Sequence, residues 1–154
     1  MSIFSFFKKK RVFFSVEDNQ QIINAIKIAE KGTSGEIRIY VEGKNSYVDA
    51  LERAKEIFFE LKMEMTKERN AVLLYIAMDD KQLALFADEG IYQRVGAAYW
   101  DNAVKEMIAQ FASHHISSGI EKCVLQVGET LKAEFPFKAE TDKNELPDDI
   151  VFGK

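Results

Sequence analysis

The sequence predicts an α/β domain in which amphipathic helices flank a small mixed sheet. Helix-patterned and strand-patterned segments alternate along 154 residues, which is near the usual length of one domain. The composition, 47% hydrophobic and 30% charged, is typical of a globular protein and too apolar for wholesale disorder. The run 71–78 is continuously apolar, as in a strand that is covered on both faces.

The first helix and strand follow from capping and periodicity. Ser15 and Asp18 stand at N-cap and N3 positions, and apolar residues then recur at helical spacing, which predicts a helix over 16–31. Gly32 ends this helix. Strict alternation of apolar and polar residues over 36–42 indicates a half-buried strand.

The middle of the chain predicts a crossover followed by a hairpin. An apolar stripe indicates a helix over about 47–65, and the run 71–78 would be the central strand. A polar turn at 79–81 leads to a third strand over 82–87. The helical crossover makes the first two strands parallel, and the hairpin makes the third antiparallel.

The remainder of the chain is predicted to contain two helices and a tail. Helical periodicity resumes beyond Gly90, and 138–154 is predicted to be an irregular polar tail with apolar anchors at Leu146, Ile150 and Phe152. The expected domain organisation is an N-terminal basic and aromatic segment over 1–12, the α/β domain over 13–137 and the tail.

This topology predicts which polar residues share an end of the sheet. One end would gather Glu36, Asn70, Asp88 and Glu89, and the other Glu42, Asn45, Asp79 and Asp80. Asp79 and Asp80 are most simply read as hairpin-turn residues. Carboxylates at the first end would suit a hard cation such as Ca²⁺ or Mg²⁺, with Glu36, Asp88, Glu89 and Asp101 as the candidate ligands.

Charge and composition narrow the classes of partner. The chain has 25 acidic and 21 basic residues, so its net charge of -4 argues against nucleic-acid binding. No apolar run approaches the roughly 20 residues of a membrane helix, and a cytoplasmic location is the expectation. Aromatic residues and the basic run 8–11 give residues 1–11 the character of a weak membrane-surface segment.

Familiar catalytic and metal-binding motifs are absent from the sequence. Cys123 falls on an apolar helical face and is predicted to be a core residue. His114 and His115 are adjacent, so on a helix they would diverge by about 100° and make a poor pair of ligands. Trp100 is expected to pack the last helices, or to form the wall of a cleft beside the acidic loop.

Several stretches together resemble a known family, the TPM domain. They are TSGEIRIYVE at 33–42, RNAVLLYIA at 69–77, ADEGI at 87–91, Trp100, SGI at 118–120 and FP at 135–136. The resemblance covers roughly residues 13–137. It implies a three-layer, Rossmann-like α/β/α sandwich with a mixed sheet, a cleft at the strand-end loops, and divalent-cation binding in some members.

Relatives in the thylakoid lumen are associated with acid phosphatase activity and photosystem repair. Carried over by position, Asp88 and Gly90 match the family's turn after the third strand, and Glu36 matches a polar residue that opens the first strand. The chain departs from many relatives because it shows no signal peptide, membrane anchor or glycine-rich tail.

Three functions are therefore open at the level of sequence. The first is a module that binds Ca²⁺ or Mg²⁺ through the acidic loops. The second is a metal-assisted acid phosphatase; the acidic motif itself contains no Arg or Lys to clamp a phosphate, so Arg38 and Arg94 would have to approach in three dimensions. The third is a scaffold for a protein or membrane-associated partner. The sequence does not decide the oligomeric state.

Overall fold

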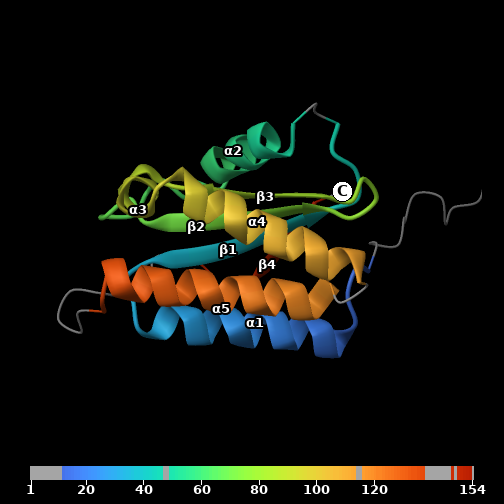
Figure 1. Cartoon of the computed structure of the whole chain (residues 1–154). Coiled ribbons are helices and arrows are strands. Elements are labelled where there is room, and N and C mark those ends of the chain that lie inside the picture. The colour runs from blue at the N-terminus through green and yellow to red at the C-terminus, as the bar shows by residue number, and fades with distance from the viewer. Residues whose placement is uncertain (1–11, 47–48, 114–115, 138–146, 148, 154) are drawn as a thin grey trace, which may run out of the picture.

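The computed structural model describes residues 12–46, 49–113, 116–137, 147 and 149–153. A mixed four-stranded sheet, in the order β3-β2-β1-β4, has α2 on one face and α1, α4 and α5 on the other (Figure 1). The α/β sandwich expected from the sequence is confirmed. The elements in chain order are α1 (Val16–Lys31), β1 (Glu36–Glu42), α2 (Ala50–Glu60), β2 (Ala71–Ala77), β3 (Gln82–Ala87), α3 (Glu89–Val95), α4 (Ala97–Ala112), α5 (Ile116–Glu134) and β4 (Ile150–Phe152).

Strands β1, β2 and β3 pair as the sequence predicts. β1 and β2 are parallel with Glu36 opposite Ala71, whereas β2 and β3 are antiparallel with Val72 opposite Ala87. α1 begins where it was expected, because the Ser15 side chain accepts a hydrogen bond of 3.0 Å from the backbone N–H of Asp18.

Helix α2 is shorter than its apolar stripe suggests. Its described part begins at Ala50, after the Asp49 carboxylate accepts a 2.9 Å hydrogen bond from the Leu51 N–H. It ends at Glu60, because Lys62 takes a left-handed conformation with φ of 55° just past the C-cap. The prediction of a helix to residue 65 was therefore wrong, since backbone geometry stopped the helix before the stripe ended.

The tail contains a strand that the sequence did not predict. Ile150, Val151 and Phe152 form β4, which pairs in parallel with Ile39, Tyr40 and Val41 of β1. Three apolar residues after a polar stretch carry little strand signal by themselves. The free edge of β1 supplies the hydrogen bonds that make them a strand. The predicted anchor Leu146 lies outside the described residues.

The region after β3 forms three helices rather than two. Gly96 separates α3 from α4 with φ of 80°, a backbone conformation that L side chains rarely adopt. The break between α3 and α4 therefore depends on the positive φ that Gly96 adopts. The spacing of apolar residues does not predict such a break. In the part of the chain that the structure describes, no helix is long and apolar enough to cross a membrane.

The sheet divides the interior into two cores. Ile37, Ile39 and Val41 face the larger core beneath α1, α4 and α5. Leu73 and Tyr75 of β2 face the smaller core beneath α2. All seven residues of β2 are buried, so this strand is covered on both faces.

Helices α1 and α5 are in tight contact at Gly128. A Cβ atom built on Gly128 would lie 2.5 Å from the Cβ of Ala29 and 2.7 Å from its Cα. Both neighbouring atoms belong to or adjoin the α1 backbone, so the overlap could be relieved only by moving one helix relative to the other.

We expect Gly128→Ala to lower the free energy of unfolding by about 1–3 kcal/mol through overpacking. Urea unfolding would measure this loss, with Glu129→Ala on the exposed side of the same helix as the control. Alanine normally stabilises a helix relative to glycine by about 1 kcal/mol. A gain in stability for Gly128→Ala would therefore contradict the tight contact.

Candidate functional site

The register of the strands places the predicted acidic end together. Glu36 of β1 is paired with Ala71, the first residue of β2. Asp88, just after β3, is aligned with the same residue, because its N–H donates a 2.9 Å hydrogen bond to the Ala71 carbonyl. Glu36 and Asp88 are only 2% and 3% exposed. The predicted meeting of these strand ends is confirmed, although both carboxylates are buried.

Asp88 is held by an arginine and by the start of a helix. Arg69 binds it through two hydrogen bonds, from Nε at 2.7 Å and from Nη2 at 2.9 Å. The Asp88 side chain also accepts a 2.8 Å hydrogen bond from the Glu89 N–H and caps α3. The hydrogen bonds to Asp88 raise the pKa of Arg69, with a smaller contribution from the charge of Glu89. This fork-shaped ion pair joins the loop before β2 to the end of β3.

Arg69 is the residue of this candidate site that the sequence interpretation overlooked. Arg38 instead lies 3.2 Å from Asp149, and the Arg94 guanidinium stacks 4.0 Å from the centre of the Phe135 ring. The sequence did contain a signal, because Arg69 stands directly before the central strand at the same end as Asp88. Arg69 also lies 3.1 Å from Glu89.

The predicted cation ligands do not form a preformed ion site in the described structure. Among the residues that the structure describes, no three His, Cys, Asp or Glu side chains are grouped so that they could hold a metal ion. Both oxygens of Asp88 already accept hydrogen bonds from Arg69. The residues present therefore do not fit a resident cation unless Arg69 moves away from Asp88.

A groove of about 770 Å³ runs along β3. Its floor is formed by residues 83–87 of β3, one wall by α2 and the other by α3 and α4. Asp88, Glu89 and Asp101 line this groove, whereas Glu36 is not among its lining residues. The structure thus brings three of the four predicted carboxylates to one surface.

The groove walls are largely aromatic and aliphatic. Phe59 on α2 and Tyr92 on α3 are 44% and 43% exposed, and Leu51 on α2 is also exposed. Trp100 is buried in the larger core, as expected of a residue that packs the last helices, and it also lines the opposite wall of the groove. The Trp100 indole N–H is buried and has no hydrogen-bond acceptor within the described residues.

The backbone of β3 presents hydrogen-bonding groups to this groove. Asp88 and Ala71 form a hydrogen-bonded pair, and such pairs alternate along an antiparallel ladder. The N–H and C=O groups of Ala84 and Phe86 therefore point to β2. Those of Leu83, Leu85 and Ala87 point away from β2, toward the open side of the sheet.

The second acidic end of the sheet has a structural role. Arg53 of α2 makes two hydrogen bonds to Glu42, of 2.9 and 3.0 Å, and the Tyr75 hydroxyl donates a 2.5 Å hydrogen bond to Glu42. Burial, followed by this hydrogen bond, raises the pKa of Tyr75. Asp80 accepts a 2.6 Å hydrogen bond from the Asn45 N–H, in keeping with the turn role expected of it.

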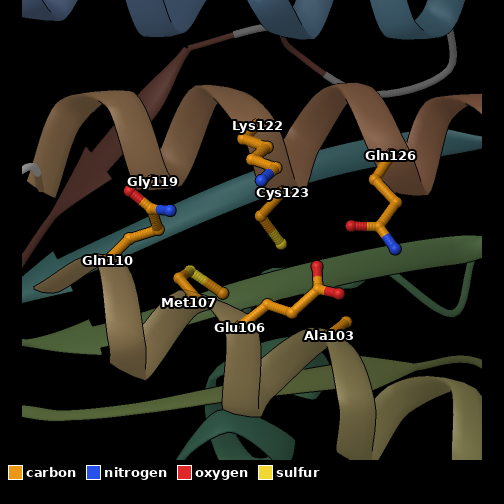
Figure 2. Close-up of a pocket in the computed structure, with 8 residues that line it drawn as sticks. All are labelled: Ala103, Glu106, Met107, Gln110, Gly119, Lys122, Cys123 and Gln126. Carbon is orange, nitrogen blue, oxygen red and sulfur yellow. The ribbon is translucent and has the colours of Figure 1, made fainter.

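Helices α4 and α5 enclose a small pocket of about 10 Å³, which has room for about one water molecule. Figure 2 shows the Cys123 sulfur pointing into it from α5, toward the side chain of Glu106 on α4. Burial, with a smaller effect of Glu106, raises the pKa of Cys123 to about 12. A protonated, buried thiol is a core residue, as predicted. His114 and His115 lie outside the described residues.

We expect Arg69→Met to lower the free energy of unfolding measurably, because it leaves the buried Asp88 carboxylate without its cationic partner. The partial exposure of Arg69 keeps the expected loss below that of a fully buried pair. Arg69→Lys should recover only part of it, since an ammonium cannot form the two-pronged contact. Lys105→Met, which removes another basic residue of the groove, is the control. Equal effects of both methionine variants in urea unfolding would contradict the role given to Arg69.

The comparisons with known proteins agree with this architecture. The model of the family described as the TPM domain matches residues 8–130. The NMR structure of BA42 protein from the psychrophilic bacterium Bizionia argentinensis is similar, with 36% sequence identity and a TM-score of 0.85, over 94% of this chain and 99% of that one. A search of curated proteins finds no match.

Two more distant structures share the fold alone. The N-terminal domain of a P. gingivalis protein has 13% identity and a TM-score of 0.64, over 79% of this chain and 78% of that one. The N-terminal domain of the cg2496 protein from Corynebacterium glutamicum has 12% identity and a TM-score of 0.61, over 80% and 84%. The family match spans well over half of the chain, and the chain therefore belongs to the TPM domain family.

Proposed function

We propose that this TPM domain is a binding module that holds an extended polypeptide segment in the groove along β3. The observation that carries the proposal is the floor of that groove, where the backbone groups of Leu83, Leu85 and Ala87 point away from β2. An added strand would form hydrogen bonds with these groups, and the walls would bind its side chains. Strand addition to an exposed edge is a common mode of peptide recognition.

The two walls suit a strand with apolar side chains on both faces. Successive residues of a strand point to opposite faces of the sheet. One set of side chains would contact Leu51 and Phe59 on α2, and the other set would contact Tyr92 and the surface around Trp100. Covering these exposed apolar side chains is the main source of affinity in this proposal.

Strand β3 also lacks the features that protect most edge strands. Its six residues, Gln-Leu-Ala-Leu-Phe-Ala, include no charge and no proline. The other edge strand, β4, has only three residues, and shortness is itself a protection. An apolar edge of this length is therefore better explained as a docking surface than as a bare edge.

We expect saturable binding of a fluorescent, capped peptide that alternates valine with leucine over six residues and ends in two lysines. Phe59→Ser and Tyr92→Ser should each weaken this binding roughly tenfold, because each removes an aromatic contact from the groove. Fluorescence anisotropy would measure the affinity. Ile108→Ser is the matched control, since Ile108 is 52% exposed on α4 but does not line the groove.

A peptide methylated at alternate backbone nitrogens tests the backbone contacts, because it keeps the side chains and loses half of its N–H donors. Strand addition requires that this peptide binds much more weakly when the methylated positions face β3. Equal affinity of the methylated and unmethylated peptides would rule out the proposed mode. An equal loss of affinity in Phe59→Ser, Tyr92→Ser and Ile108→Ser would rule it out as well.

A divalent-cation site is the second candidate function. It is favoured by the position of Asp88, Glu89 and Asp101 along one groove, where carboxylate oxygens are the ligands that Ca²⁺ and Mg²⁺ prefer. Because Arg69 holds Asp88, an ion would have to compete with a guanidinium for the same oxygens. This competition predicts weak binding, in the millimolar range.

We expect that Ca²⁺ or Mg²⁺, titrated while amide chemical shifts are recorded, perturbs residues 87–91 and the neighbourhood of Asp101. Asp88→Asn should abolish the response, and Arg69→Gln should strengthen it, since glutamine removes the competing charge. Glu56→Gln, which alters an acidic residue on α2 away from this groove, is the control. Absence of a saturable response in the wild type and in Arg69→Gln would eliminate the cation reading.

Phosphomonoester hydrolysis remains a prediction from the family resemblance. Asp88 and Arg69 do bring a carboxylate and a guanidinium together on the groove. In this arrangement, however, they bind each other, and no side chain of the groove has been identified as the group that would activate water.

A further inference from the structure

We propose that the segment held in the β3 groove is residues 3–7 of the same chain, which would add to β3 as a fifth, antiparallel strand. The inference rests on the proposed function, because it names the occupant of the groove described there. Residues 1–11 lie outside the described residues, so the argument starts from their sequence and from the position of the residues that follow them.

The sequence of the segment matches the chemistry of the groove. Residues 3–7 read Ile-Phe-Ser-Phe-Phe and contain no charge, proline or glycine. β-branched and aromatic residues favour strands, and apolar side chains on both faces are what the two walls would cover. The next four residues, Lys8-Lys9-Lys10-Arg11, end the apolar stretch abruptly.

The start of the described chain lies within reach of the groove. The Phe13 ring stacks on Phe152 of β4, with 6.2 Å between centroids. Phe152 pairs with Val41, Val41 with Ile76, and Ile76 with Leu83, so these four residues form one row across the sheet. A strand added beyond β3 would lie four strand spacings from Phe152, which is about 19 Å. The six Cα–Cα steps from Phe13 to residue 7 span about 20 Å when extended, so a nearly straight chain brings residue 7 to the Leu83 end of the groove.

The direction of the chain then determines how the segment runs. Residue 7 would lie near Leu83 and residue 3 near Ala87, so the segment runs opposite to β3. An antiparallel neighbour forms its hydrogen bonds with alternate residues, and Leu83, Leu85 and Ala87 are the residues whose backbone groups face outward.

Charge complementarity supports the same path. The basic residues 8–11 would cross the end of the sheet where Asp79 and Asp80 form the exposed turn between β2 and β3. Asp49 is exposed at the same end, on the N-cap of α2, and it lines the groove. Four positive charges beside these carboxylates would favour the docked position, and high salt would weaken it.

The first experiment is amide hydrogen exchange on the full chain without added peptide. We expect slow exchange at Leu83, Leu85 and Ala87, although these N–H groups do not point to β2. In the full-length double variant Phe4→Asp/Phe6→Asp they should exchange at least roughly tenfold faster. The amides of Ala84 and Phe86 are the internal control, since they pair with β2 in both proteins. Fast exchange at all three outward amides of the wild type would overturn the proposal.

The second experiment locates the segment directly. A spin label on Ser5→Cys, in a Cys123→Ala background, should broaden the amide signals of residues 83–87 much more strongly than those of β4 on the opposite edge of the sheet. Mixing spin-labelled protein with isotope-enriched protein that carries no spin label distinguishes broadening within one molecule from broadening between two molecules. Broadening that appears only between molecules would overturn an intramolecular strand. Broadening confined to vesicles of anionic phospholipid would place the segment on a membrane surface and equally overturn it.

Failure of this inference can be told apart from failure of the proposed function. If residues 3–7 occupy the groove, Phe4→Asp/Phe6→Asp should bind the alternating valine-leucine peptide more tightly than the wild type, because a competitor has been removed. Equal binding by both proteins, with unprotected outward amides, would leave the groove as a peptide site and exclude residues 3–7 as its occupant.

Discussion

The arrangement of this protein depends on one constraint, the complete burial of β2. Its seven residues face apolar side chains on both sides, so the chain must supply helices to both faces and strands to both edges. The crossover through α2 covers one face, and α1, α4 and α5 cover the other (Figure 1). A strand covered in this way can carry a polar side chain only where a partner is supplied, as Glu42 is for Tyr75, so most polar side chains lie at its ends.

At those two ends the protein uses the same device, an arginine bound to a buried carboxylate. Arg53 holds Glu42 beneath α2, and Arg69 holds Asp88 at the start of α3. Each ion pair ties a helix or loop to the sheet and compensates the cost of burying a charge. The Arg69 pair also lines the groove, so it is the one that a ligand or a cation would disturb.

The two edges of the sheet are treated differently. β4 closes the β1 edge with three residues, whereas β3 leaves an apolar backbone edge between two helical walls. An uncovered edge of this kind can pair with other chains and promote aggregation. In a protein that binds an extended segment, the same edge is the binding surface. The groove therefore links the fold to the proposed function more directly than the acidic residues do.

The sequence by itself determined the local elements, because capping and apolar periodicity act within a few residues. Ser15 marked the start of α1, and alternation marked β1. It also placed Glu36, Asp88 and Glu89 at one end of the sheet, since chain direction and crossover handedness follow from the order of elements. Tertiary structure alone decided the rest. β4 exists because β1 has a free edge, and Asp88 is an ion-pair partner because the loop before β2 brings Arg69 to it. The groove forms from three segments that no local pattern connects, so only their packing reveals it.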